Sequence, residues 1–302
     1  MQHPPPLPWA SLSQEEHEFQ YNPQRASPNF ADHQLARAPA NAAAQTSLKA
    51  YVDLPYGDHP LRRVDIYPAA GAEGPAPVHV FFHGGYWRAQ DKENFAFLAA
   101  PFVARGITTV IANYELCPGS TLDGVADSAI AAVEWTFRNI ADYGGNSMRI
   151  GLSGHSAGAH LCAEILAVDW WERDIDPSFI AGTVLISGIF DPAPAIRTTV
   201  NAQLKLTPEI AARHNVERRP AQLQCPTWIY VGGLEPWHWI DLSFRYSHHL
   251  RRHGRDPEVH VLPGWGHFDI INHYADPESP IFAAALAATR GRYDRPTGSA
   301  SA

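Results

Sequence analysis

Short apolar runs alternate along most of the chain with longer stretches whose apolar residues recur at helical spacing. Runs of about four to eight apolar or β-branched residues are typical of buried strands. The predicted strands are residues 78–82, 107–114, 148–153, 181–187, 226–231 and 258–262. The predicted helices are residues 91–105, 123–143, 159–166, 240–252 and 280–289. Strands that alternate with helices predict an α/β fold with a mostly parallel central sheet and helices on both faces.

The first fifty residues do not show this alternation of predicted strands and helices. We interpret residues 1–50 as an N-terminal arm, whose first part is kept extended by prolines such as Pro23 and whose Ala-rich residues 31–49 can hold one or two helices. Aromatic residues in the arm, including Tyr21 and Phe30, indicate that it packs on the body of the protein or on a second copy in a homodimer.

The main domain is predicted to span residues 51–292, and it opens with antiparallel strands at 51–54 and 62–67. Within it, the proline-containing residues 191–220 interrupt the alternation and predict a small cap insertion over the active site. Residues 293–302 predict a flexible tail.

Composition narrows the class of protein. With 302 residues and 45% hydrophobic content, the chain can bury a large core as one domain. A net charge of −8 without a basic cluster argues against a nucleic-acid partner. The N-terminus does not resemble a signal peptide and no apolar run is long enough to span a membrane, so we expect a cytoplasmic protein without a membrane partner. Three widely spaced cysteines predict free thiols, with no metal site and no cofactor: Cys117, Cys162 and Cys225.

The sequence Gly154-His155-Ser156-Ala157-Gly158 lies between a predicted strand and a predicted helix. A G-x-S-x-G pattern in this context is typical of a nucleophile elbow, a turn so tight that the serine takes a strained backbone conformation. The serine hydroxyl then projects at the carboxyl edge of the sheet, beside a helix N-terminus that favours a developing oxyanion. Ser156 is therefore the predicted nucleophile.

A serine hydroxyl needs a base, and the base needs an acid that holds its tautomer. In an elbow architecture the acid and then the histidine follow the serine along the chain. His267 lies in a glycine-rich loop directly after the last predicted strand, and Glu235 follows the strand before it. We predict His267 as the base and Glu235 as the acid, with Asp241 as the alternative acid.

A second glycine-rich segment, His83-Gly84-Gly85-Tyr86-Trp87, follows the buried strand 78–82. Its place is that of the loop that completes an oxyanion hole with the N–H group after the nucleophile. The predicted oxyanion donors are Gly84, Gly85, Tyr86 and Ala157. His83 and His155 are interpreted as structural histidines, with His155 directed away from the reacting serine.

Together, the segments 83–87 and 154–161 resemble those of the kynurenine formamidase (arylformamidase) group of the α/β-hydrolase superfamily. Tyr143-Gly144-Gly145, residues 185–191 and His267-Phe268-Asp269-Ile270 are also similar to that group. The resemblance covers roughly residues 50–290 and implies an α/β-hydrolase fold and a serine hydrolase that removes a small acyl group from an aromatic amine. Residues 213–216 and 237–239 differ from the pattern of that group near the expected substrate pocket, so the identity of the substrate is not determined by the resemblance.

Several aromatic residues fall on loops at the expected mouth of the site, and they predict an aromatic-lined pocket for a small aromatic molecule. They are Tyr86, Trp87, Trp237, Trp239 and Phe268. Arg88 is a candidate for contact with a substrate carboxylate or for a surface role. The alternative functions are a carboxylesterase of the same fold acting on small esters or carbamates and, ranked below it, a non-catalytic ligand receptor.

Overall fold

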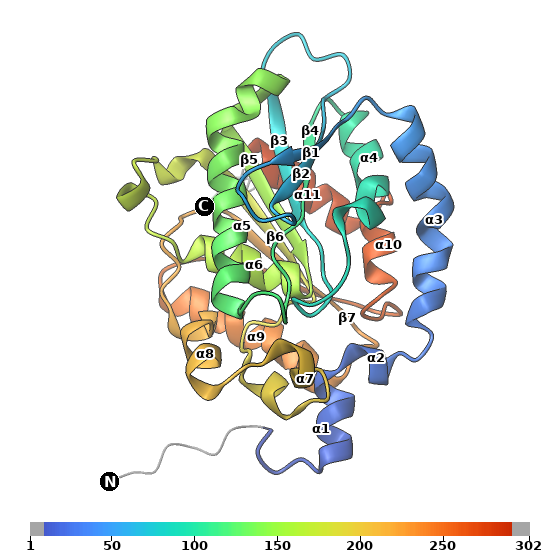
Figure 1. Cartoon of the computed structure of the whole chain (residues 1–302), viewed down its shortest axis with the longest axis vertical. Helices are drawn as coiled ribbons and strands as arrows, with labels where there is room; N and C mark the ends of the chain where they lie inside the picture. Colours follow the sequence, from blue (N-terminus) through green and yellow to red (C-terminus); the bar gives the residue numbers. More distant parts are fainter. Residues whose placement is uncertain (1–8, 292–302) are drawn as a thin grey trace, which may run out of the picture.

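A computed structural model describes residues 9–291 of the chain, so the predicted tail 293–302 and the first eight residues of the arm lie outside the described residues. The centre is an eight-stranded sheet in the order β1-β2-β4-β3-β5-β6-β7-β8, in which β2 is antiparallel to β1 and β4, and the remaining neighbours are parallel (Figure 1). The strands are β1 (Tyr51–Pro55), β2 (Arg63–Tyr67), β3 (Ala76–Phe82), β4 (Thr108–Ala112), β5 (Gly145–His155), β6 (Ile180–Ile186), β7 (Thr227–Gly232) and β8 (Glu258–Leu262).

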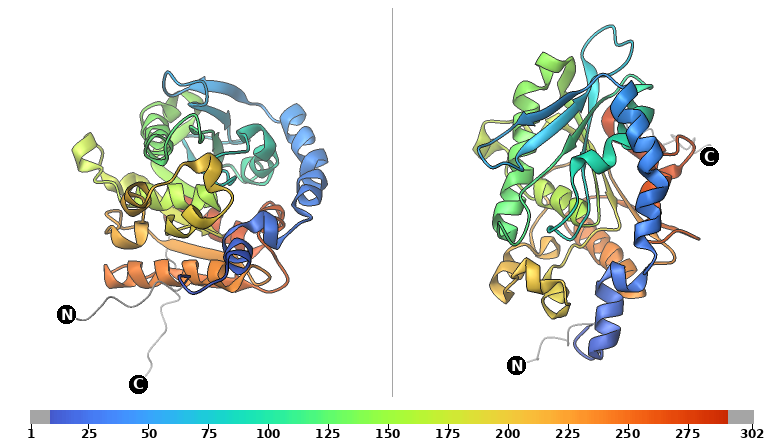
Figure 2. Two further views of the ribbon diagram at one scale, coloured as in Figure 1. Left: turned by 60° about the horizontal axis from the view of Figure 1, so that its bottom comes forward. Right: turned by 45° about the vertical axis from the view of Figure 1, so that its right-hand side comes forward.

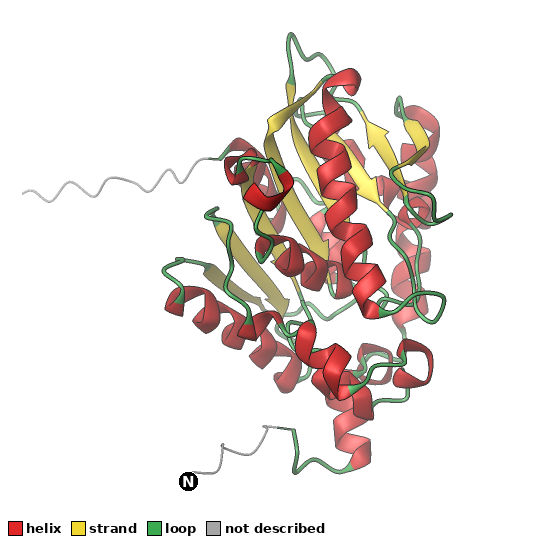
Figure 3. Cartoon of the chain, turned by 60° about the vertical axis from the view of Figure 1, so that its left-hand side comes forward, coloured by secondary structure: helices red, strands yellow, loops and turns green. Residues whose placement is uncertain are grey.

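Helices cover both faces of the sheet, as the alternating pattern predicts (Figures 1 and 3). Successive side chains of a strand point to opposite faces, so in β3 Val80 and Phe82 enter one apolar core while Phe81 enters the other. The first core lies under α5 (Leu122–Asn139), α6 (Ala157–Leu166) and α9 (Trp237–Arg252). The second lies under α4 (Ala99–Val103), α10 (Ile270–Tyr274) and α11 (Pro280–Arg290).

The register of the central strands brings two loops together. Phe82 at the end of β3 pairs with Gly154 near the end of β5, and Gly154 pairs with Leu185 of β6. The chain leaves β3 into the predicted oxyanion loop and leaves β5 into the predicted elbow. Because parallel strands end at the same edge of a sheet, both loops lie side by side at its carboxyl edge.

The arm is more helical than its prolines predict. It forms α1 (Gln14–Tyr21), α2 (Pro23–Ala26) and α3 (Phe30–Ser47). Pro23 occupies the first turn of α2, where a missing N–H has no cost, so it begins a helix instead of preventing one.

The arm packs on the body of its own chain. α1 contacts α9 through the hydrogen bond between Tyr21 Oη and His238 Nδ1 at 3.0 Å. α3 runs beside the 3-10 helix η1 (Lys92–Leu98), where Gln45 Nε2 donates to the Glu93 carbonyl at 2.9 Å. Figure 2 shows α3 lying against the side of the molecule.

A buried ion pair ties η1 to the edge strands. Lys92 Nζ lies 3.0 Å from Asp65 Oδ1 and 2.7 Å from Asp53 Oδ1, and the Lys92 and Asp65 side chains are only 2% and 4% exposed. Breaking a buried pair from one side leaves an uncompensated charge, which costs about 3–5 kcal/mol. We therefore expect Lys92→Met to lower the free energy of unfolding in urea by about 3 kcal/mol.

The double variant Lys92→Met/Asp65→Asn is the control, because it leaves no buried charge and should regain part of that loss. A Lys92→Met protein with wild-type stability would show that this pair carries no net stabilisation.

Candidate active site

Ser156 occupies a strained turn between β5 and α6. Its backbone φ of 56° and ψ of −117° are unfavourable for a residue with a side chain. The turn is so tight that a Cβ on Gly154 would collide with the backbone of Gly158, and one on Gly158 would collide with the carbonyl of Phe82. These two positions therefore need glycine, and the segment has the geometry that the G-x-S-x-G pattern predicts.

Three side chains from three loops form a continuous hydrogen-bonded chain. His267 Nε2 lies 3.0 Å from Ser156 Oγ, and His267 Nδ1 lies 2.6 Å from Glu235 Oε2. Because an ionised carboxylate only accepts, Nδ1–H donates to Glu235, which leaves Nε2 to accept from the serine hydroxyl. All three residues are at most 6% exposed. The site thus presents a serine hydroxyl to an oriented imidazole nitrogen.

The carboxylate of Glu235 is itself held in place. Its Oε1 accepts hydrogen bonds from the Gly232 backbone N–H at 2.8 Å and from Ser187 Oγ at 2.5 Å. Asp241, the alternative acid, lies within α9, is 38% exposed and faces Arg245 at 3.5 Å. Of the two acids that sequence reasoning left open, Glu235 is the one hydrogen-bonded to His267.

His155 faces the site and does not point away from it, contrary to the sequence interpretation. It lines the pocket, and its Nε2–H donates to the backbone carbonyl of His267 at 2.8 Å. Burial, reinforced by the proximity of His267 and by the positive charge of Arg37, holds the pKa of His155 well below its ordinary value, so the ring is neutral at physiological pH. This contact fixes the loop that carries His267.

The loop after β3 lies directly against the elbow. A Cβ on Gly84 would approach Ser156 Cβ to 3.1 Å, and Gly85, Tyr86 and Trp87 all have positive φ. Gly84, Gly85 and Tyr86 line the pocket beside Ser156, and Ala157 begins α6 as the next residue after Ser156. The structure brings together the four residues predicted to supply oxyanion donors, and their role in catalysis stays a prediction.

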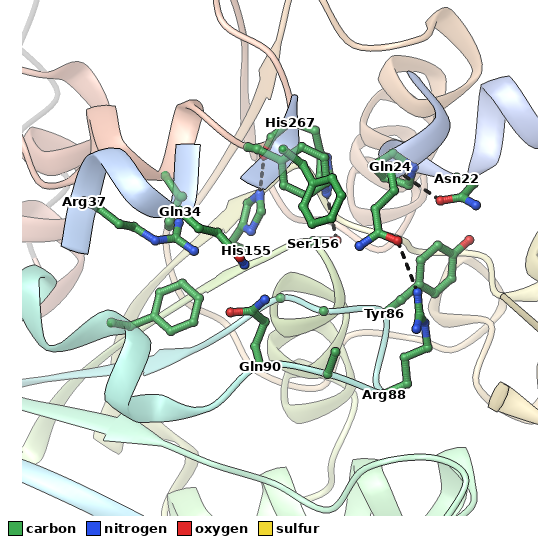
Figure 4. A pocket seen from close by; sticks show the side chains of 18 residues that line it. Asn22, Gln24, Gln34, Arg37, Tyr86, Arg88, Gln90, His155, Ser156 and His267 are labelled. Carbon is green, nitrogen blue, oxygen red and sulfur yellow. Dashed lines mark hydrogen bonds between the residues drawn. The ribbon is translucent and has the colours of Figure 1, made fainter. Parts of the chain in front are cut away.

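A pocket open to solvent lies above Ser156. Figure 4 shows its lining side chains, which come from the arm, the loop after β3, the elbow and the His267 loop. Its aromatic lining residues are Phe30, Tyr86, Phe95 and Phe268. The amide and guanidinium side chains in its wall are Asn22, Gln24, Gln34, Arg37, Arg88 and Gln90.

The three tryptophans predicted to contact substrate are not among the lining residues. Trp87 is fully buried with its ring edge-to-face on His160 at 5.0 Å, and Trp237 is 60% exposed. Trp239 is buried behind the site, where Nε1 donates to the Ser187 carbonyl at 3.0 Å and the ring contacts His267 at 4.9 Å. Helix α9 begins at Trp237 itself, and within this helix Trp237 is exposed while Trp239 packs behind His267.

The arm occupies the place expected for the cap. None of the described residues that line the pocket comes from 191–220, which instead carries α7 (Asn201–Leu204) and α8 (Pro208–Arg213). This segment supports the arm: the Thr199 backbone N–H donates to Glu18 Oε2 of α1 at 2.9 Å. Sequence reasoning missed Phe30, Gln34, Arg37 and Phe95 as pocket residues, although it noted the aromatic character of the arm.

Residues 9–291 contain no group of three or more His, Cys, Asp or Glu side chains placed to hold a metal ion. Within the same range no helix is both long and apolar enough to cross a membrane. The three cysteines are free thiols, as predicted: Cys117, Cys162 and Cys225.

The strand order, the elbow after β5 and the aligned Ser156, His267 and Glu235 define an α/β-hydrolase. The BD-FAE family model matches residues 64–180. Kynurenine formamidase of Danio rerio is 31% identical over 279 residues, which cover 89% of this chain and 94% of that protein. Kynurenine formamidase of Salmo salar is 28% identical over 280 residues, with the same coverage of 89% and 94%. The chain therefore belongs to the kynurenine formamidase family, and it is a hydrolase.

Among solved structures, a proposed thioesterase from a Silicibacter species superposes with a TM-score of 0.77 at 26% identity, over 90% of this chain and 99% of that one. The α/β-hydrolase fold and the family resemblance predicted from the sequence are both confirmed.

Proposed function

We propose that this enzyme hydrolyses the formamide of an aromatic amine such as N-formylkynurenine, with Ser156, His267 and Glu235 as its catalytic triad. The observation that carries the proposal is the hydrogen-bonded chain from Glu235 through His267 to Ser156, which ends inside a pocket with aromatic walls. Relatives named kynurenine formamidase that match nearly the whole chain support this choice of substrate class.

In the first half of the reaction, Ser156 Oγ attacks the formyl carbonyl carbon while His267 Nε2 accepts the hydroxyl proton. The tetrahedral intermediate collapses as His267 returns this proton to the amide nitrogen, and the neutral aromatic amine leaves. The formyl group remains as an ester of Ser156. Glu235 keeps Nδ1 of His267 protonated throughout, so that Nε2 is the nitrogen that exchanges the proton.

In the second half, His267 takes a proton from water, and the resulting hydroxide attacks the formyl ester. Collapse of this intermediate returns the proton from His267 to Ser156 Oγ and releases formic acid, which ionises to formate in water. Both intermediates carry an oxyanion, for which Gly84, Gly85, Tyr86 and Ala157 are the proposed backbone donors. The N-terminus of α6 adds partial positive charge at the same place.

The lining of the pocket suggests which end of the substrate lies where. Tyr86 lines the pocket together with Ser156 and is fixed by its hydroxyl, which donates to the Tyr21 carbonyl at 2.7 Å. This rigid ring restricts the acyl side. The aromatic leaving group then fits between Phe95 on one side and the pair Phe30 and Phe268, whose rings lie 5.5 Å apart.

We expect kcat/KM to fall with acyl length when the aryl leaving group is held constant. Overfilling a rigid pocket costs about 1–3 kcal/mol, so butyryl should be at least about tenfold poorer than formyl or acetyl. The measurement is a series of anilides and aryl esters from formyl to hexanoyl. A maximum at butyryl or beyond would replace the formamidase proposal by a general carboxylesterase. A short-acyl preference without formanilide cleavage would favour a small-acyl esterase.

A further inference from the structure

Arg37 reaches the pocket from the arm. It lies in α3, is half-buried, and lines the same pocket as Ser156 and His155. Figure 4 shows its side chain extending from the ribbon of α3 beside Gln34, on the His155 side of the pocket. A positive charge therefore lies in the wall of the pocket that the substrate is proposed to fill.

The charge of Arg37 has no anionic partner in the described part of the chain. Among residues 9–291, no carboxylate lies within ion-pair distance of its guanidinium and no hydrogen bond holds it; its contacts are the rings of Phe95 at 4.9 Å and Phe97 at 5.8 Å. Burial lowers the pKa of Arg37 to about 10, so the group is still protonated at neutral pH. A half-buried cation without a counter-ion is unfavourable on its own and favours an anionic ligand.

Arg88, the other cation in the pocket wall, is different. Its Nη1 donates to Gln203 Oε1 at 2.5 Å and its Nη2 donates to Gln24 Oε1 at 3.3 Å. Two of its donors are thus already used in joining the arm to residues 191–220. Arg88 Nε is buried without a partner, but both Nη groups of Arg88 are used, whereas no hydrogen bond among the described residues uses a side-chain donor of Arg37. Of the two arginines, Arg37 is therefore the one with both Nη groups available to a carboxylate.

We propose that Arg37 binds a carboxylate carried by the leaving-group side of the substrate, and this inference rests on the proposed function. A formyl group has no atoms that could carry an anion, so any anionic group belongs to the aromatic amine. The planar guanidinium suits a two-point contact with a carboxylate, while Phe95 supports its face. Gln34, one helical turn earlier in α3, lies beside it as a further polar group. The arm thus supplies the selectivity for acidic aromatic substrates.

The test compares N-formylkynurenine with its neutral carboxamide in the full-length enzyme and in Arg37→Gln. Hydrogen bonds to charged groups contribute about 1.5–3 kcal/mol, so Arg37→Gln should lose about 10- to 100-fold in kcat/KM on the acid. It should lose less than about twofold on the carboxamide. Arg37→Lys should retain an intermediate preference, because a point charge replaces the fork. Equal losses on both substrates, or no loss on either, would overturn the assignment.

Arg88→Gln is the matched control, because it removes a guanidinium from the same pocket. It should leave the acid-to-carboxamide ratio nearly unchanged, and a collapse of the ratio in this variant alone would move the anion site to Arg88. The same variants are assayed on aryl acetates that carry a carboxylate or a carboxamide on the phenol. If the enzyme cleaves these esters but no formamide, the proposed substrate class fails, while the ester ratio still decides whether Arg37 binds the anion.

Discussion

Replacing Ser156 by alanine should lower kcat for formanilides and aryl esters by about 10³-fold or more. The variant loses the only group that His267 Nε2 contacts in the hydrogen-bonded chain, and with it the proposed covalent intermediate. The backbone at this position has a strained φ of 56°, which alanine tolerates about as well as serine, so the fold should persist.

The measurement is steady-state turnover together with thermal unfolding of both proteins. Turnover within a few-fold of the wild-type rate by a folded Ser156→Ala enzyme would remove the mechanism as a whole, because no other hydroxyl is hydrogen-bonded to His267 among the described residues.

Glu235→Gln should lower kcat by about 10³- to 10⁴-fold, whereas Asp241→Asn should change it less than about threefold. The substituted side chain would keep the volume of the original but present an amide in place of the carboxylate that accepts from His267 Nδ1 at 2.6 Å. The imidazole would then lose both its fixed tautomer and the stabilisation of its charged form. Asp241 contacts Arg245 on the partly exposed face of α9, and no hydrogen bond among the described residues joins it to His267.

The two substitutions are matched, since each converts one carboxylate into its amide within seven residues of chain. A larger loss in Asp241→Asn than in Glu235→Gln would move the role of the acid from Glu235 to Asp241.

The sequence predicted the centre of the fold well because its signals there are local. The continuous apolar run at 78–82 and the strand-turn-helix context of Ser156 each need only neighbouring residues for their structure. The order of strands along the chain determines which loops meet at the carboxyl edge of the sheet, and this order is why the sequence predicts His267 and Glu235 beside Ser156.

The wall of the pocket could not be predicted in the same way. Phe30 and Arg37 line the pocket that contains Ser156 because α3 packs along η1, a contact between segments whose sequences carry no sign of their pairing. The sequence pattern predicts a loop at Trp237 and Trp239, but α9 begins at Trp237, which leaves that ring exposed and places Trp239 behind His267. The direction of a side chain depends on such boundaries, which are the least certain part of any sequence-based prediction.

The most direct test of the central claim, that Ser156 is the activated nucleophile of this pocket, is titration with an aryl fluorophosphonate followed by peptide mass spectrometry. We expect one equivalent to abolish hydrolysis, with a single phosphonyl adduct on the peptide that contains Ser156. Labelling should be slowed by N-formylkynurenine and absent in Ser156→Ala. An enzyme that remains fully active with excess reagent, or that is inactivated by an adduct on another residue, would contradict the account.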